Sequence, residues 1–316
     1  MNKTDNRSNS SQPLPALLWT CGQATTGVVT ATELYLLFAL LVHAYRNYKL
    51  KKTNKRLITV FAILTPALHL VNILVTELQI LTPSSTALQR YPHTCDLLVA
   101  LKPVTFFLAT LPSYLFFWHR QRTLYRSKAL VRLNNRCVRI LNVASIAAIV
   151  AGGLVGLALN EAFFRRHLRL TGAGCMFADH NAPTYYLNSL TGAVFVAATS
   201  TMFALFVYPL RKHRGASSAS RIARRAVFKA TGSLAVCIVS DVLAPLVVVL
   251  LFPPTWPRYT TSVVYDVASM CNSAAVVLSY DCSCVILALG GCSNPAVRRG
   301  GERGGISGER DTTSGC

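Results

Sequence analysis

Charged residues are scarce in this sequence: they make up only 14% of its 316 residues, and only 12 residues are acidic. Because an ordinary soluble domain carries about 25% charged residues, a soluble protein of this length is excluded, and the 52% of hydrophobic residues must face lipid. The 32 Lys and Arg residues give a net charge of +20. They alternate with long apolar runs instead of gathering on one soluble surface, so we expect no nucleic-acid binding.

Catalytic signatures are missing as well. The sequence has no His-Glu-x-x-His motif, no glycine-rich phosphate loop and no pair of intramembrane aspartates at catalytic spacing, and its seven histidines are scattered. We therefore expect no enzyme, no metal and no cofactor. The chain has no repeat of 20 to 50 residues. Its first eighteen residues lack the apolar core of a signal peptide, so the first apolar run is expected to direct insertion itself.

Seven apolar runs are long enough to cross a bilayer, which takes about 20 residues of helix. They lie near Gly27–Tyr45, Leu57–Leu81, Asp96–Trp118, Val138–Asn160, Tyr185–Leu210, Ala226–Phe252 and Ser262–Leu289. Their interiors are continuously apolar, whereas barrel strands alternate. The sequence thus predicts an all-α membrane protein: an extracellular tail (1–24), a seven-transmembrane helix bundle (25–290) and a disordered cytoplasmic tail (291–316).

The distribution of basic residues predicts the orientation of the bundle. The first, third and fifth connections, counted with the first turn of the run that follows each, and the C-terminal tail hold 24 of the 32 Lys and Arg residues. Short cytoplasmic loops collect such residues. The N-terminus is therefore expected outside and the C-terminus inside. Asn2, Asn6 and Asn9 each begin an Asn-X-Ser/Thr triplet, which predicts glycosylation of the outer tail. A disordered polar tail with chance triplets is the alternative.

This topology also sorts the ten cysteines. Cys95 at the start of the third run and Cys175 in the following outer connection both lie on the oxidising side, which predicts a disulfide between them. Two free thiols are the alternative, and Cys21 is a competing partner. Three cysteines near the inner surface are candidates for palmitoylation: Cys282, Cys284 and Cys292.

Arg120 follows Cys95 by twenty-five residues, and its neighbours are His and Gln. With the seven runs and the two cysteines, this spacing resembles that of the rhodopsin-like (family A) G-protein-coupled receptors, in which the arginine of the Asp-Arg-Tyr motif stands at the same distance. In the seventh run, "NSAAVVLSY" places Asn272 and Tyr280 in the register of Asn-Ser-x-x-Asn-Pro-x-x-Tyr, with the central Asn-Pro replaced. Pro245 stands at the proline of Cys-Trp-x-Pro. The resemblance implies a divergent plasma-membrane receptor that passes a signal from an extracellular ligand to a heterotrimeric G protein.

Ionisable groups inside an apolar run are costly and by default functional, and four of those in this sequence are candidates: Glu33, Lys102, Asp241 and Asp266. Lys102 lies seven residues after Cys95, at the place where the resembling family binds a ligand's charged group. It is a candidate to bind an anionic ligand, with Asp266 and Glu33 contributing to the site. The alternative is a salt bridge from Lys102 to Asp266 or to Glu33, and both interpretations can hold together.

A second group of residues would act as the signalling switch that the resemblance implies: Arg120, Asp241, Pro245, Asn272 and Tyr280. Asp241 would belong to a hydrogen-bonded or sodium-linked network, or else be a lone protonated carboxyl. Pro245 should kink its helix. Arg120 also marks where the third run meets the anionic inner headgroups. A small transporter or channel is the alternative function, since intramembrane charges suit ion paths, but transporters usually show internal repeats.

Overall fold

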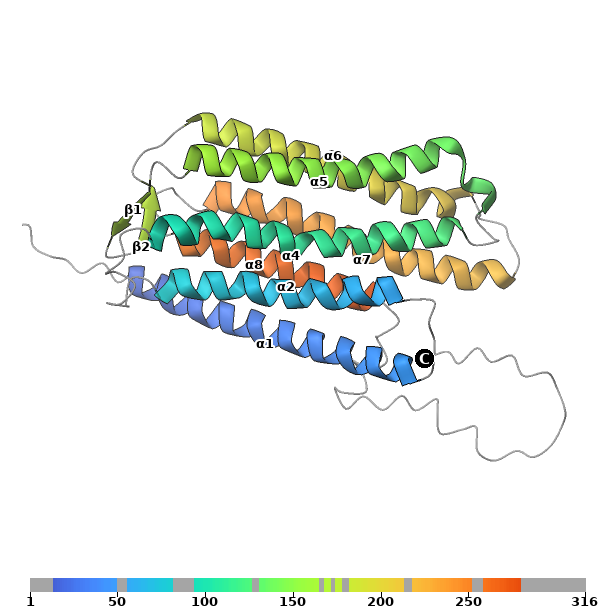
Figure 1. The fold of residues 1–316 in the computed structure, drawn as a ribbon, viewed down its shortest axis with the longest axis horizontal. Helices are drawn as coiled ribbons and strands as arrows, with labels where there is room; N and C mark the ends of the chain where they lie inside the picture. The colour runs from blue at the N-terminus through green and yellow to red at the C-terminus, as the bar shows by residue number, and fades with distance from the viewer. Residues whose placement is uncertain are drawn as a thin grey trace, which may run out of the picture.

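The computed structural model describes residues 14–49, 56–81, 94–126, 131–164, 168–171, 174–177, 182–212, 218–251 and 258–279. Within these ranges seven long helices lie side by side (Figure 1). They are α1 (Leu14–Lys49), α2 (Arg56–Leu81), α4 (Thr94–Tyr125), α5 (Arg136–Phe164), α6 (Ala182–Lys212), α7 (Ser218–Leu251) and α8 (Arg258–Ser279). A short 3-10 turn, η2 (Val131–Leu133), precedes α5.

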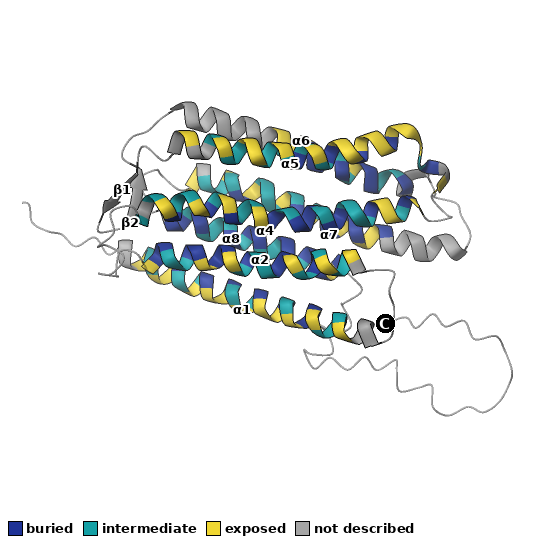
Figure 2. Cartoon of the chain, in the orientation of Figure 1, coloured by how far each residue is buried: buried dark blue, intermediate teal, exposed yellow. Residues whose placement is uncertain are grey.

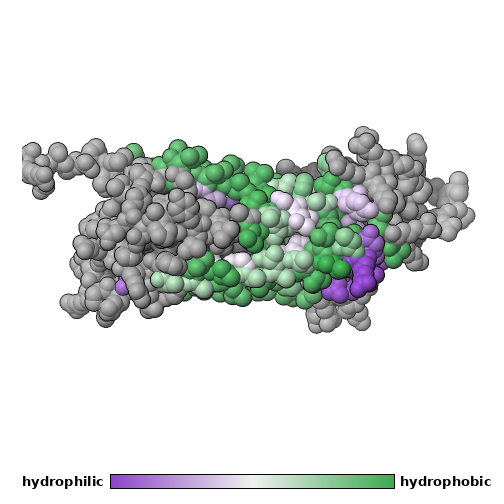
Figure 3. All heavy atoms as spheres, turned by 90° about the horizontal axis from the view of Figure 1, so that it is seen from above, coloured by the Kyte–Doolittle hydropathy of each residue, from purple (hydrophilic) through white to green (hydrophobic). Residues whose placement is uncertain are grey.

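The helices have membrane dimensions. Six of them contain a described stretch that is long and apolar enough to cross a bilayer, and the described apolar part of the seventh, α6, is Val194–Pro209. The chain is therefore a helical, multi-pass membrane protein, as hydropathy predicted. In Figure 3, hydrophobic residues in green, with near-neutral ones between them, make up most of the coloured middle of the visible face.

One boundary differs from the sequence prediction. Residues 14–24 were assigned to a tail, but α1 begins at Leu14. The added turns pack against the bundle, because the indole of Trp19 donates a hydrogen bond to the carbonyl of Ile80 at 3.3 Å and the ring of Tyr259 lies against Gly22. At the other limit, α8 is described to Ser279, so the predicted end of the last run at Leu289 lies outside the described residues.

A two-stranded antiparallel hairpin, β1 (Leu168–Thr171) and β2 (Gly174–Phe177), caps one end of the bundle (Figure 1). β1 contacts α4, and β2 contacts α2 and α8. We call this the hairpin end: α4 and α8 begin there, and both run to the opposite end, where they finish at Tyr125 and Ser279.

The helices differ in how much of their surface other helices cover. In its most apolar window α8 is 56% buried, whereas the window of α5 is 17% buried. Figure 2 marks many exposed residues in yellow along the outer helices α1 and α5. Because α8 contacts α1, α2, α4 and α7, it is the helix whose polar side chains have the best chance of meeting partners away from lipid.

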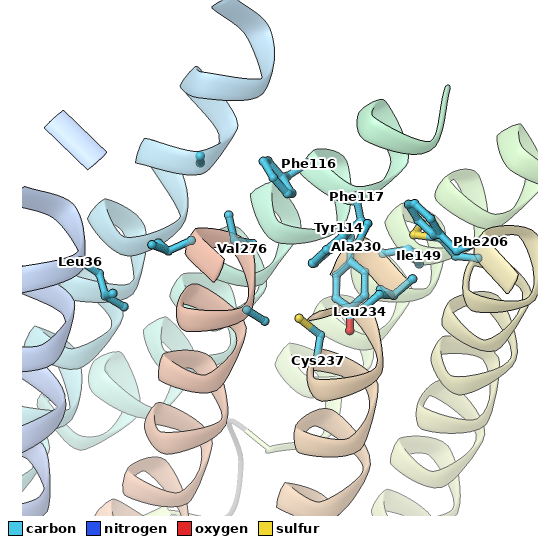
Figure 4. Close-up of a cluster of buried hydrophobic side chains, with 14 of the residues drawn as sticks. Leu36, Tyr114, Phe116, Phe117, Ile149, Phe206, Ala230, Leu234, Cys237 and Val276 are labelled. Atoms are coloured by element: carbon cyan, nitrogen blue, oxygen red, sulfur yellow. The ribbon is translucent and has the colours of Figure 1, made fainter. Parts of the chain in front are cut away.

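The apolar core lies toward the middle of the bundle, where Tyr114, Phe116 and Phe117 of α4 meet Phe206 of α6 and Leu234 of α7 (Figure 4). These side chains are buried, and their rings fill the space between the helices. Fully burying such a side chain contributes roughly 1.5 to 3 kcal/mol. The core therefore fixes α4 at the centre, in contact with helices that come from both halves of the sequence.

Candidate functional site

Polar side chains form a buried stripe along α2. They recur at alternating spacings of four and three residues, which places them on one face of a helix. The residues are Thr65, His69, Asn72, Thr76 and Gln79, and none is more than 4% exposed. This regularity within an apolar run is a signal that the sequence offered and that a search for charged groups passes over.

The stripe of α2 pairs with a second stripe on α8. At the hairpin end, Ser262 donates to the amide oxygen of Gln79 at 2.7 Å. The amide of Asn72 donates to Asp266 at 2.7 Å. Further along, His69 lies 2.5 Å from the hydroxyl of Ser273. The two helices are thus joined by side-chain hydrogen bonds in three successive layers. These bonds give the polar side chains the partners that lipid cannot provide.

Lys102 lies at the centre of the polar groups near the hairpin end, which we call the Lys102 cluster. Its ammonium forms a salt bridge with Asp266 at 2.6 Å, and it donates to the hydroxyl of Thr76 at 2.5 Å and to the carbonyl of Asn72 at 3.1 Å. Asn72 also accepts a hydrogen bond from Thr105 at 2.9 Å. An ammonium has three donors, so the interactions of Lys102 are complete within the protein.

Two atoms beside this cluster are unsatisfied among the described residues. The carboxylate oxygen Oδ2 of Asp266 and the hydroxyl of Ser269, one turn further along α8, are buried without a hydrogen-bond partner. A ligand that binds here without rearrangement would therefore have to donate a hydrogen bond to Asp266. An anion would have to displace Asp266 from Lys102.

Glu33 is not the partner of Lys102. Its carboxylate Oε1 lies 3.3 Å from Nδ1 of His69, and we call these two residues the Glu33–His69 pair. Both side chains are fully buried, at 0% exposed. Of the two ion pairs that the sequence allowed for Lys102, the structure contains the one with Asp266. The reason is geometric: α1 contacts α2 and α8, whereas α4 is not among its main neighbours.

Asp241 is the centre of a separate group, the Asp241 cluster, that joins three helices. Its carboxylate accepts a hydrogen bond from the hydroxyl of Tyr114 on α4 and another, at 2.9 Å, from the amide of Asn272 on α8. Ser240 donates to the same Asn272 at 3.0 Å. Of the alternatives for Asp241, the structure shows a hydrogen-bonded network. Pro245 follows one turn later, and α7 continues past it to Leu251.

Arg120 lies at the opposite end of α4 and binds the end of α8. Its guanidinium donates to both the carbonyl and the hydroxyl of Ser279, the latter at 2.6 Å. On either side of Arg120, the ring nitrogen Nδ1 of His119 and both amide atoms of Gln121 are buried and unsatisfied among the described residues. We call the Arg120 and Ser279 interaction the Arg120 contact.

The other predicted site residues are not brought together within the described residues. Asn2, Asn6, Asn9, Tyr280, Cys282, Cys284 and Cys292 lie outside the described ranges. Cys95 lies in the first turn of α4 and Cys175 in β2, but their side chains are not described, so their disulfide remains a prediction. Cys21, the competing partner, is a free thiol.

Sequence reasoning missed residues that complete these clusters, chiefly His69, Asn72 and Tyr114. They are uncharged or weakly basic, so an intramembrane charge search does not find them. The spacing along α2 finds His69 and Asn72, whereas Tyr114 on α4 has no comparable signal. Within the described ranges, no group of three His, Cys, Asp or Glu side chains is arranged to hold a metal ion. No protein-family model matches the chain, and no curated protein sequence matches it.

Proposed function

We propose that this chain is a plasma-membrane receptor of the rhodopsin-like kind, with the hairpin end outside, that passes an extracellular ligand signal to a heterotrimeric G protein. One observation carries the proposal: α4 contacts α7 or α8 at three levels, through the Lys102 cluster, the Asp241 cluster and the Arg120 contact. These polar contacts span most of the bundle. They give one helix a role at the ligand end, in the middle and at the partner end.

The spacing of these levels suits transmission across a membrane. Lys102 and Arg120 are eighteen residues apart, which is about 27 Å of helix. Both ends of α4 bind α8, at Asp266 and at Ser279. A ligand that separates Lys102 from Asp266 therefore removes a polar attachment between the helices that Arg120 also joins. If the ligand binds the state with Lys102 and Asp266 apart more tightly than the paired state, it raises the population of that state. The positions of α4 and α8 at the Arg120 contact would then change with it.

The expected ligand carries an anionic group such as a carboxylate. It would take the place of Asp266 at the Lys102 ammonium, since the three donors of that ammonium are already used. The displaced Asp266 would retain its hydrogen bond from Asn72. Exchange of one carboxylate for another keeps the buried charge balanced, which lowers the cost of opening the pair.

The deciding experiment measures G-protein dissociation in cells that express the tagged chain, in the basal state and with a library of anionic ligands. Arg120→Ala should abolish a signal that the wild-type chain gives. Arg122→Ala is the matched control, because Arg122 is an exposed arginine two residues further along the same helix, stacked on Trp118. A signal unaffected by Arg120→Ala, or no signal at normal surface expression, would contradict the proposal.

The orientation rests on the charge distribution and the sequons, and it has its own test. If the N-terminus is outside, glycosidase treatment should increase the gel mobility of the wild-type chain. The triple variant with Gln at Asn2, Asn6 and Asn9 should not respond. A wild-type chain that glycosidase leaves unchanged, but whose N-terminal tag is protected in intact cells, would reverse the orientation.

A small transporter or channel is the second candidate, and a specific observation favours it. Buried polar atoms without partners among the described residues occur along the α2 and α8 interface, at His69, Asp266 and Ser269. Such atoms are the places where water or ions could be held along a path. Substrate-dependent currents or uptake, with no G-protein response, would favour this function over the receptor.

A further inference from the structure

The Glu33 carboxylate lacks a full counter-charge in the described part of the chain. It is completely buried. Its Oε1 lies 3.3 Å from Nδ1 of His69, while its Oε2 and the Nε2 of His69 have no hydrogen-bond partner among the described residues. The buried ammonium of Lys102 gives its three hydrogen bonds to other groups. Among the described residues, His69 is thus the group placed to balance the negative charge of Glu33.

The charges around the pair make the imbalance larger. Titratable groups on the surrounding helices include Glu77 of α2, Lys102 and Tyr114 of α4, Asp241 and Cys237 of α7, and Asp266 and Cys271 of α8. One buried ammonium therefore stands against the carboxylates of Glu33, Asp241 and Asp266. An ionised Glu33 beside a neutral His69 would add an unpaired negative charge to an already acidic interior, and burying such a charge is very costly.

We propose that Glu33 and His69 together bind one proton taken from water, so that the pair as a whole is neutral. The geometry supports this, because Nδ1 of His69 lies 3.3 Å from Glu33 Oε1 and 2.5 Å from Ser273 Oγ. A proton on Nδ1 is donated toward both oxygens, and a proton on Glu33 Oε1 is donated to Nδ1. In either form the proton lies at the junction of α1, α2 and α8.

The proton site adjoins the Asp241 cluster. Ser273, which contacts His69, directly follows Asn272, which donates to Asp241. Loss of the proton would leave an unpaired charge where α1, α2 and α8 meet, and would weaken the packing of α8. The inference concerns the bundle itself and does not depend on a receptor function.

The folded chain would hold a proton that the unfolded chain releases at neutral and alkaline pH. Folding stability should therefore fall as the pH rises. We would measure the unfolding temperature of the full chain in nanodiscs from mildly acidic to alkaline pH. The wild type should lose at least about 5 °C over this range. Glu33→Gln, which removes the charge and keeps the shape, should lose much less.

Glu77→Gln is the matched control, since it removes another carboxylate, half-buried on α2, with the same substitution. This variant should keep most of the wild-type loss of stability. Repeating the measurement at low and high sodium separates a proton from a metal cation: a stability that depends on sodium but not on pH overturns the proposal. So does a pH profile that Glu33→Gln leaves unchanged.

If Glu33→Gln fails to fold, spectroscopy of the wild type still decides. NMR of chain with nitrogen-15-labelled histidine reports whether His69 is an imidazolium, with its signal assigned by elimination through single substitutions of the other six histidines. Infrared spectroscopy reports a protonated carboxyl group. A protonated His69 at neutral pH supports the proposal, as does a neutral His69 with a protonated-carboxyl band that Glu33→Asp shifts. A neutral His69 without that band overturns it.

Discussion

Replacing Lys102 by methionine should leave the Asp266 carboxylate buried without its counter-charge. Asp266 is 1% exposed, and its Oδ1 accepts hydrogen bonds from Lys102 at 2.6 Å and from Asn72 at 2.7 Å. After the substitution Asp266 keeps the hydrogen bond from Asn72 but has no counter-charge. Methionine fills much of the volume of the lysine stem, so the expected loss comes from charge and hydrogen bonding and much less from an empty cavity.

The size of the loss follows from the burial of the pair. Removing one partner of a buried ion pair costs about 3 to 5 kcal/mol. At about 2 to 4 °C per kcal/mol for a chain of this size class, the midpoint of thermal unfolding should fall by about 6 to 20 °C. Asp266→Asn, which leaves the ammonium of Lys102 buried without a carboxylate, should show a loss of the same order.

The double variant separates a coupled pair from two independent residues. Lys102→Met with Asp266→Asn contains neither charge, and the asparagine introduced at position 266 retains hydrogen-bonding capacity toward Asn72. Its loss should be smaller than the sum of the single losses by about 2 kcal/mol or more. The assay is thermal unfolding in nanodiscs, with surface expression in cells as a second readout. If the two single losses add, the reasoning that treats the residues as one charge-balanced unit is refuted.

Two smaller predictions test the packing of α4. A Cβ atom at Gly153 would overlap the ring of Phe107, whereas one at Gly152 would meet the side chain of Val194 at 3.6 Å. Gly153→Ala should therefore cost about 1 to 3 kcal/mol of stability and Gly152→Ala much less. Equal unfolding temperatures of the two variants would contradict this packing. Tyr114→Phe removes the hydroxyl that donates to Asp241 and should lower the stability by about 1 to 3 kcal/mol. The assay is the unfolding temperature, and an unchanged value would show that this hydrogen bond does not stabilise the bundle.

The helices were predictable because a helix that crosses a bilayer must be apolar over its length. A run of about 20 apolar residues has few alternatives to a spanning helix. Hydropathy therefore located the seven helices, six of which contain a described stretch long and apolar enough to cross a bilayer. The first helix was placed too late, because the segment from Leu14 to Leu18 is short and follows a polar tail. Its helical structure is supported by the contact of Trp19 with Ile80, which joins residues far apart in the sequence and leaves no local pattern.

The polar residues were predictable as a set but not as partners. An ionisable side chain in an apolar run is visible in the sequence, and Glu33, Lys102, Asp241 and Asp266 all proved to be bound to polar groups. Which residue each of them meets depends on the rotation of every helix about its axis. That rotation is set by how the apolar side chains of neighbouring helices interlock, and the sequence of one helix does not contain it.

The partner of Glu33 shows why this information matters. On charge alone, Lys102 is the natural counter-ion for either Glu33 or Asp266, since electrostatic attraction does not distinguish the two carboxylates. The structure assigns Lys102 to Asp266 because α4 packs beside α2 and α8, while α1 lies on the far side of those helices. Glu33 is then left with His69, which carries a charge only when it is protonated. Helix packing therefore decides which carboxylate meets a lysine and which one meets a histidine.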